Sequence, residues 1–247
     1  MIDTHIHLVP GVDDGAKDMD TAIQMLRVAN NDGVKEMILT PHFNTPLYQN
    51  ENVIEKYGVL KEYVATNMVD FKMHLGNEIY LSEEDVDAIK TGKAYTMGNT
   101  RYLLLELPVY QFYPFHEMMI RDLQENGYRI VLAHVERYQI FKNQPQMLED
   151  LVKRGIYCQI TASYIVDKKT RKKAFKLIKD GLAHIVASDG HNLDKRPPVM
   201  KMAYEIVYKA FGSRCADLLF IENPRAMIMD SVLGDFNIGQ KKKLQLF

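Results

Sequence analysis

Seven short apolar runs alternate with segments of helical character along the chain, and this alternation predicts the fold. The runs cover residues 1–9, 36–43, 71–79, 102–108, 129–137, 157–163 and 183–191. They lack strict apolar–polar alternation, which is typical of strands in a parallel sheet that is covered on both faces. Because a helical segment follows nearly every run, we expect parallel strands joined by right-handed crossovers.

Capping residues and apolar stripes mark the helices between these runs. Asp18 opens one such segment, whose apolar positions recur at helical spacing until Gly33. Further helices are predicted over residues 52–69, 82–90, 114–126, 145–154, 167–180 and 198–211. A glycine follows the last four of them, as is common where helices end. Residues 93–100 predict a hairpin or a loop insertion.

The strand count narrows the choice of architecture. Seven strands with helical crossovers indicate an α/β barrel, either seven-stranded or eight-stranded with one degenerate strand. A length of 247 residues suits a single barrel domain over residues 1–247, and two small domains less naturally.

The composition limits which binding partners and which cellular compartment are expected. The net charge is −1, so no overall field favours nucleic acid or an anionic membrane. No apolar stretch approaches the roughly 20 residues that cross a bilayer, and a strand-like run at residue 1 leaves no room for a signal peptide. Cys158 and Cys215 form no disulfide framework, which favours the cytoplasm. The basic run Lys241–Lys243 is interpreted as a solvated tail.

Residues able to bind metal stand at the C-terminal end of six of the seven runs, or just past it. A β/α barrel builds its active site at those strand ends. One H-x-H pair is weak evidence, but recurrence at six strand ends is hard to obtain by chance. The candidates are His5, His7, Asp14, His42, Glu78, Glu106, His134, Asp189 and His191. In contrast, His74, His116 and His184 stand away from the strand ends, and we expect them to be structural.

The donor set predicts the kind of metal site. It contains nitrogen and oxygen only, which disfavours iron–sulfur clusters and cysteine zinc sites. There are too many donors for one ion, so we expect two or three divalent ions. With three ions, four carboxylates leave two positive charges, which suits a hydroxide and a phosphate-like anion. Such clusters activate water and clamp both the attacking and the leaving oxygen.

The order of these residues resembles the PHP (polymerase and histidinol phosphatase) superfamily of metal-dependent phosphoesterases, over about residues 1–195. More narrowly, the segments MIDTHIHLVPGVDDGAKD and LAHVERY resemble bacterial protein-tyrosine phosphatases of capsular and exopolysaccharide loci, which act on a partner tyrosine kinase. The resemblance implies a distorted (β/α)7 TIM-like barrel of PHP type. It also implies three divalent ions, usually manganese, although these ligands also admit iron, zinc or cobalt.

The resemblance also implies a division of the ligands among three ions. It assigns His5, His7, Glu106 and Asp189 to the first ion, Glu78, Glu106 and His134 to the second, and Asp14, His42 and His191 to the third. Arg137 and Arg196 match phosphate-binding arginines, Arg196 less closely. The doublet Asp13–Asp14 leaves open which aspartate is the ligand.

We therefore expect a metal-dependent protein-tyrosine phosphatase that acts through in-line attack by a metal-bound hydroxide, with Arg137 on the phosphate oxygens. A cysteine-based phosphatase is disfavoured, because neither cysteine has an arginine six positions on. The aromatic residues of segment 108–115 either contact the phosphotyrosine ring or, with more weight, pack on the next helix. Four alternatives remain: a small-molecule phosphatase of histidinol phosphate type, an enzyme acting on nucleic acid, a non-catalytic regulatory subunit and an amidohydrolase.

Overall fold

The computed structural model describes residues 1–235, so Lys241–Lys243 lies outside the described residues. All strand pairings in it are parallel. The strands are β1 (Ile2–Ile6), β2 (Glu36–Leu39), β3 (His42–Phe43), β4 (Lys72–Leu75), β5 (Glu78–Tyr80), β6 (Tyr102–Glu106), β7 (Arg129–Leu132), β8 (Tyr157–Thr161) and β9 (Ile185–Ala187). They form two sheets, with the orders β1-β2-β4 and β3-β5-β6-β7-β8-β9.

These strands occupy seven positions, because two of the seven runs are broken in the middle. Strand β3 continues β2 after residues 40–41, and β5 continues β4 after residues 76–77. The side-chain amide of Asn77 donates a hydrogen bond of 2.9 Å to the carbonyl of Pro41, which ties the two breaks together. The expected seven-position α/β barrel is thus confirmed, in a distorted form.

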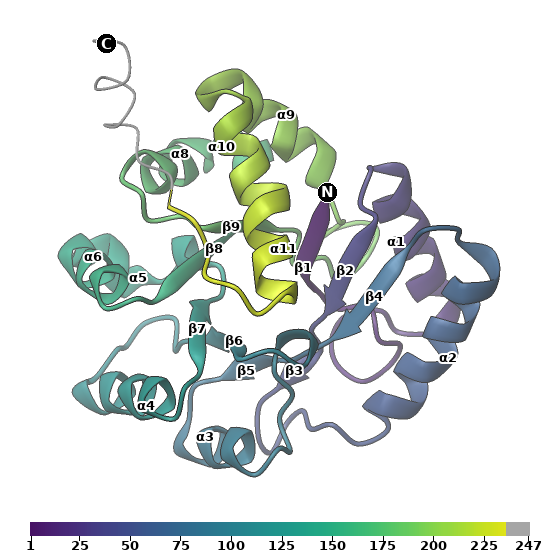
Figure 1. The fold of residues 1–247 in the computed structure, drawn as a ribbon, viewed down its shortest axis with the longest axis horizontal. Helices are drawn as coiled ribbons and strands as arrows, with labels where there is room; N and C mark the ends of the chain where they lie inside the picture. The colour runs from purple at the N-terminus through teal and green to yellow at the C-terminus, as the bar shows by residue number, and fades with distance from the viewer. Residues whose placement is uncertain (236–247) are drawn as a thin grey trace.

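Hydrogen bonds between the first and last strand positions close the ring. The backbone N–H of His7 donates to the carbonyl of Gly190 at 2.9 Å, and that of Asp189 donates to His5 at 2.8 Å. A helix lies outside most of the strand positions (Figure 1). These helices are α1 (Met19–Asn31), α2 (Val53–Asn67), α3 (Glu83–Lys90), α4 (Pro114–Glu125), α5 (Gln139–Asn143), α6 (Pro145–Lys153), α7 (Ala162–Val166), α8 (Arg171–Lys179) and α9 (Met200–Phe211).

The expected caps are present at the starts of two helices. Asp18 accepts a hydrogen bond from the N–H of Thr21, and Ser82 accepts one from Asp85, which satisfies N–H groups that a helix leaves unpaired. One prediction was wrong in part: the helix expected over residues 167–180 begins only at Arg171, because residues 167–170 form a turn after α7. Residues 93–100 form a loop with a single 3-10 turn, which confirms the loop alternative.

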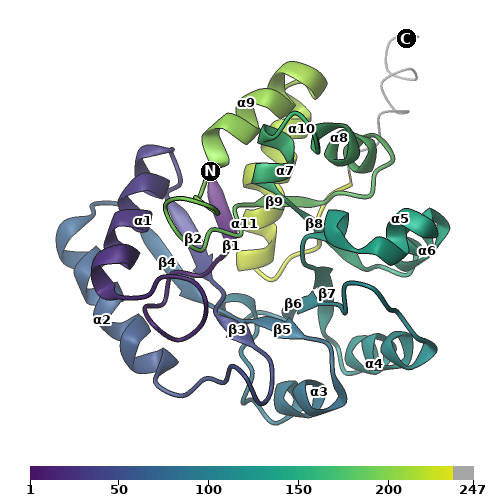
Figure 2. The same ribbon diagram turned by 180° about the vertical axis from the view of Figure 1, so that it is seen from behind.

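The C-terminal elements cover the end of the ring that is opposite to the strand C-termini. They are α10 (Ser213–Asp217), the π-helical η3 (Leu218–Glu222) and α11 (Asn223–Ile228). Met227 and Leu233 pack with ring-interior residues such as Leu104 and Val131. In Figure 1 α11 crosses in front of the strands, and Figure 2 shows the other side, where the loop after β1 lies in front. No helix within residues 1–235 has the length and apolar character needed to cross a membrane.

Candidate metal centre

All nine predicted metal-binding residues gather at the C-terminal ends of the strands. They come from β1 and its following loop, β3, β5, β6, and the segments just after β7 and β9. Eight of the nine side chains form three groups, in each of which the candidate ligand atoms lie within 4.8 Å of one another, and His134 lies beside the third group. The groups are His5, His7, Glu78 and Asp189; His7, Asp14, His42 and His191; and His42, Glu78 and Glu106.

The first group is completely buried. The Nε2 atoms of His5 and His7 are 3.1 Å apart, as expected for alternate residues on one face of β1. Glu78 Oε2 lies 3.2 Å from each of these nitrogens. Asp189 Oδ1 lies 3.4 Å from the first and 3.6 Å from the second. Two imidazoles and two carboxylates therefore surround one point.

The second group is nearer to solvent. Asp14 Oδ1 lies 3.3 Å from Nε2 of His42 and 3.4 Å from Nε2 of His191. The Asp14 side chain is about half exposed, whereas His191 is buried. The rings of His7 and His191 have their centroids 3.8 Å apart, so His7 lies between the first two groups.

The third group places Glu78 at the centre of the site. His134 Nε2 lies 2.7 Å from Glu78 Oε1 and 3.7 Å from Glu106 Oε1, and His42 Nδ1 lies 3.1 Å from Glu78 Oε2. The family resemblance implies that Glu106 is shared between two ions. In this arrangement Glu78 is the carboxylate that two groups share.

The charges of the site are those of a cation-binding centre. Burial disfavours the charged form of His5, but the carboxylates of Glu78 and Asp189 outweigh it and raise its pKa to about 9. Burial raises the pKa of Glu106, as does the neighbouring charge of Glu78. Asp189 Oδ1 and His191 Nε2 are buried and have no hydrogen-bond partner within residues 1–235. Such atoms are normally satisfied, so these residues fit divalent cations.

The two aspartates of the doublet have different surroundings. Asp13 Oδ2 lies 2.7 Å from His7 Nδ1 and accepts a hydrogen bond of 3.0 Å from the backbone N–H of His42. Asp13 therefore fixes the imidazole of His7 and the backbone of His42 from the side away from the ligand atoms. Carboxylates often orient metal-binding imidazoles in this way. Asp14 is the doublet's member in the ligand groups. The geometry favours Asp14 as the metal ligand and Asp13 as the residue that holds His7 and His42 in place.

Gln159 is a functional residue that the sequence did not reveal. Its Oε1 lies 3.1 Å from His5 Nδ1 and accepts a hydrogen bond of 2.9 Å from the backbone N–H of His134. The Gln159 side chain thus fixes the ring of His5 so that Nε2 points into the site. It lies on β8, whose run carries no His, Asp or Glu. The sequence signal that could have identified Gln159 is its spacing of two residues from Thr161, which puts both side chains on the same face of the strand.

Two arginines lie beside the buried carboxylates. Arg137 and Arg196 both donate to Asp189 Oδ2, Arg196 at 2.6 Å, and Arg137 also donates to Thr161 Oγ1 at 3.3 Å. Both arginines line a cavity of about 360 Å³, together with Ser163 and Tyr164. Their remaining N–H groups can therefore meet an anion beside the metal groups.

The other histidines have structural partners. His74 Nε2 lies 3.0 Å from Glu36 Oε1, and His116 Nδ1 accepts from the N–H of Tyr113 at the start of α4. His184 Nδ1 accepts a hydrogen bond of 3.0 Å from the backbone N–H of Cys158, near the N-terminal end of β8. These contacts confirm their interpretation as structural residues.

The aromatic side chains of segment 108–115 differ in burial: one packs against the core and the others are exposed. Phe112 packs against the core, with its ring centroid 6.5 Å from that of Phe141. Tyr110 is 80% exposed, and Tyr113 and Phe115 are also exposed. Phe112 therefore packs on α5, whereas the rings of Tyr113 and Phe115 lie against His116 of α4 and remain partly open to solvent.

A parallel β/α barrel with clustered histidines and carboxylates at its strand ends, next to two arginines, defines the class of metal-dependent hydrolases. The sequence matches the family described as "Capsular polysaccharide synthesis, CpsB/CapC" over residues 1–229, and the chain belongs to this family. It is 30% identical over 243 residues to tyrosine-protein phosphatase CpsB of Streptococcus pneumoniae, covering 94% of this chain and 100% of that protein. It is 31% identical over 238 residues to tyrosine-protein phosphatase YwqE of Bacillus subtilis (strain 168), covering 94% and 93%.

Solved structures agree with this placement. One match is described as YwqE from Bacillus subtilis and CpsB from Streptococcus pneumoniae, unique metal-dependent tyrosine phosphatases. Its TM-score is 0.89 at 30% identity, and it covers 96% of this chain and 97% of that chain. Histidinol phosphate phosphatase of Lactococcus lactis has a TM-score of 0.58 at 14% identity, covering 86% and 94%, and shares the fold alone.

Proposed function

We propose that this protein is a metal-dependent protein-tyrosine phosphatase that hydrolyses phosphotyrosine on a protein substrate. The observation that carries the proposal is the position of Asp189. One oxygen of its carboxylate faces His5 and His7 in the buried group, and the other accepts from Arg137 and Arg196 beside a cavity. Metal ligands and anion-binding groups therefore meet at one residue. The names of the relatives at about 30% identity support a phosphotyrosine substrate.

Three divalent ions, most readily manganese, are proposed for this site. The residues that would hold them are the eight of the three groups, His5, His7, Asp14, His42, Glu78, Glu106, Asp189 and His191, together with His134 beside Glu78. When bound, such ions supply a nucleophile from water near neutral pH and neutralise charge on phosphoryl oxygens. Iron, zinc or cobalt would also accept this donor set.

The protein's own residues would bind and orient the phosphate. The guanidinium groups of Arg137 and Arg196 are planar forks that can each hold two phosphate oxygens. Thr161 and Asp189 fix the direction of Arg137, so its position is set before the substrate arrives. Tyrosine leaves as a phenolate, whose conjugate acid has a pKa of about 10, so the reaction has little need of a strong general acid.

The partner and cellular setting belong to the same proposal. We infer that the substrate is a tyrosine kinase that controls capsular or exopolysaccharide synthesis, since the family description names capsular polysaccharide synthesis. We also infer a cytoplasmic location and a single PHP-type barrel domain over residues 1–247. The nearly complete coverage of relatives of similar length supports the single domain.

Phosphate release from three substrates tests this function. Metal-free protein is assayed with and without manganese on a phosphotyrosine peptide, a phosphoserine peptide and histidinol phosphate. Release that depends on manganese and is largely confined to phosphotyrosine is the expected result. A preference for histidinol phosphate would keep the metal centre but refute the protein substrate.

A further inference from the structure

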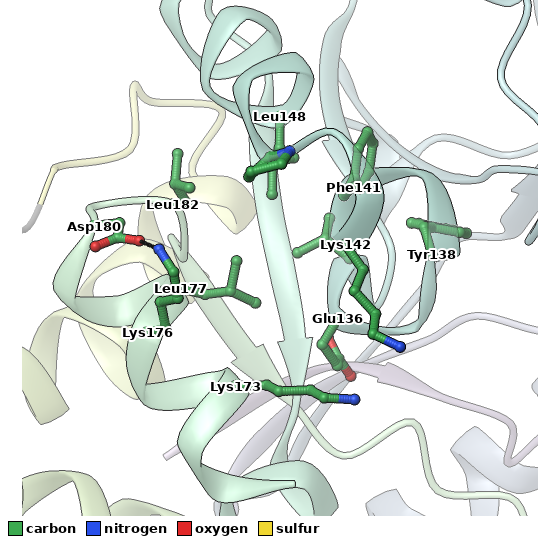
Figure 3. A pocket seen from close by; sticks show the side chains of 12 residues that line it. Glu136, Tyr138, Phe141, Lys142, Leu148, Lys173, Lys176, Leu177, Asp180 and Leu182 are labelled. Carbon is green, nitrogen blue, oxygen red and sulfur yellow. Dashed lines mark hydrogen bonds and ion pairs between the residues drawn. The ribbon is translucent and has the colours of Figure 1, made fainter.

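A recess lies on the flank of the barrel between α5, α6 and α8 (Figure 3). Its volume is about 220 Å³, enough for one or two apolar side chains. Its apolar walls include Phe141 and Leu148 from one side and Leu177 and Leu182 from the other. We call this recess the basic groove, because lysines surround its opening. They are Lys142, Lys173 and Lys176.

The charge around the basic groove is positive although the whole chain has a net charge of −1. Helix α8 carries five basic residues and no acidic one, and Lys168 and Lys169 precede it. Within residues 1–235, no carboxylate lies within ion-pair distance of Lys142 or Lys173, whereas Lys176 pairs with Asp180. Six basic side chains of this region are exposed to solvent: Lys142, Lys168, Lys169, Lys172, Lys173 and Lys176.

Two carboxylates also line the groove and reduce this charge in part. Asp180 is neutralised by Lys176, and Glu136 Oε1 accepts a hydrogen bond of 3.0 Å from the N–H of Thr161. In Figure 3 the side chains of Lys142 and Lys173 reach from opposite walls toward the end of the groove where Glu136 lies. The excess of lysines over carboxylates around the groove leaves it positive, so it complements an acidic ligand.

One short element contributes residues to both the groove and the cavity of the proposed phosphate site. The 3-10 turn η2 (Val135–Arg137) contributes Val135 and Glu136 to the groove and Arg137 to the cavity beside Asp189. A chain that presents its phosphotyrosine to Arg137 would therefore have neighbouring residues within reach of the groove. The exposed lysines would meet acidic side chains, and the apolar walls would bury an apolar one.

The shape of the groove favours a protein segment over a lipid surface. Leu148 and Leu182 are only 2% and 6% exposed, so the apolar walls lie inside the recess. A flat bilayer could touch the lysines but not those walls, whereas a protruding leucine or phenylalanine side chain could enter.

We propose that the basic groove binds an acidic segment with one apolar anchor residue, next to the phosphotyrosine of the substrate protein. This inference rests on the proposed function, since it assigns the sequence around the hydrolysed residue. The groove thus supplies specificity among phosphotyrosine proteins, and the metal centre supplies the reaction.

The test compares phosphotyrosine peptides by kcat/KM with the manganese-loaded protein. In one peptide series an Asp-Leu-Glu triplet stands at increasing distances on either side of the phosphotyrosine. Two matched series carry Asn-Leu-Gln or Asp-Ser-Glu, and free phosphotyrosine reports on the centre alone. The wild type should prefer the best-placed Asp-Leu-Glu peptide over both matched peptides, and added salt should weaken the preference over Asn-Leu-Gln.

The variant Lys142→Glu/Lys173→Glu should lower kcat/KM for that peptide by roughly fivefold or more and leave free phosphotyrosine unchanged. The double variant Lys201→Glu/Lys209→Glu, at exposed positions of α9, is the charge-matched control and should keep the preference.

Three other results would each overturn the assignment. Equal rates for the three peptide series, or a preference that survives in the double variant, would show that the groove does not read the sequence. Binding of phosphatidylglycerol vesicles through the same lysines, with no peptide discrimination, would assign the groove to a membrane. If free phosphotyrosine is hydrolysed but the three peptide series are not distinguished, only the role of the groove is refuted. If no phosphotyrosine substrate is hydrolysed, the proposed function itself is refuted.

Discussion

Replacing Gln159 with leucine tests the support of the metal centre without removing a ligand. The change removes the acceptor that faces His5 Nδ1 at 3.1 Å and the backbone N–H of His134 at 2.9 Å. The amide of His134 would then be buried without a partner, which costs about 1–3 kcal/mol. For a chain of this size that loss lowers Tm by roughly 2–12 °C. Because the ring of His5 also loses its orienting contact, manganese affinity should fall about 10–100-fold.

Two measurements separate these effects. Competition with a metal chelator gives the manganese affinity, and calorimetry of the metal-free protein gives Tm. Gln146→Leu is the matched control, because Gln146 is exposed on α6, where it donates to Asp150, and both quantities should stay unchanged. A Gln159→Leu variant with lower Tm but wild-type manganese affinity would refute the reasoning, since Gln159 would then be a packing residue only.

The other predictions concern ligands, supports and the ions. Arg137→Ala should keep bound metal, measured by elemental analysis, and lower kcat by about 10²–10³, since it removes a group that stabilises phosphoryl charge; loss of metal would contradict this. His42→Ala should lower metal content and activity together, whereas His184→Ala, at the other end of the ring, should leave the metal content of folded protein unchanged. Asp14→Ala should lose metal from one group, while Asp13→Asn should retain more of it in the same titration; the reverse order would exchange their roles. Chelation of bound metal should lower Tm in calorimetry, because buried carboxylates lose their counter-charges; an unchanged Tm would argue against buried cations.

The sequence predicted the parts of the site that repeat from strand to strand. His42, Glu78, Glu106 and His134 each end an apolar run or directly follow one, and a parallel barrel brings such ends together. The strand count followed from the same pattern.

What the sequence could not give depends on contacts between distant segments. Gln159 has an uncharged side chain inside a strand, and its role exists only because His5 and His134 lie beside it. The central position of Glu78 follows from the breaks in two strands, whose geometry no local pattern encodes. The late start of α8 at Arg171 has the same kind of cause, since its guanidinium donates to carbonyls of α7.

The closure of the ring between β1 and β9 has a consequence for biosynthesis. His5 and His7 are synthesised well before Asp189 and His191, which complete their groups. Domains generally fold as units as synthesis proceeds from the N-terminus. The nascent chain therefore displays an incomplete set of donors, and tight capture of an ion must wait until β9 pairs with β1. With the proposed ions, the order of synthesis would keep metal loading behind folding, and a finished cavity rather than a loose histidine pair would select the ion.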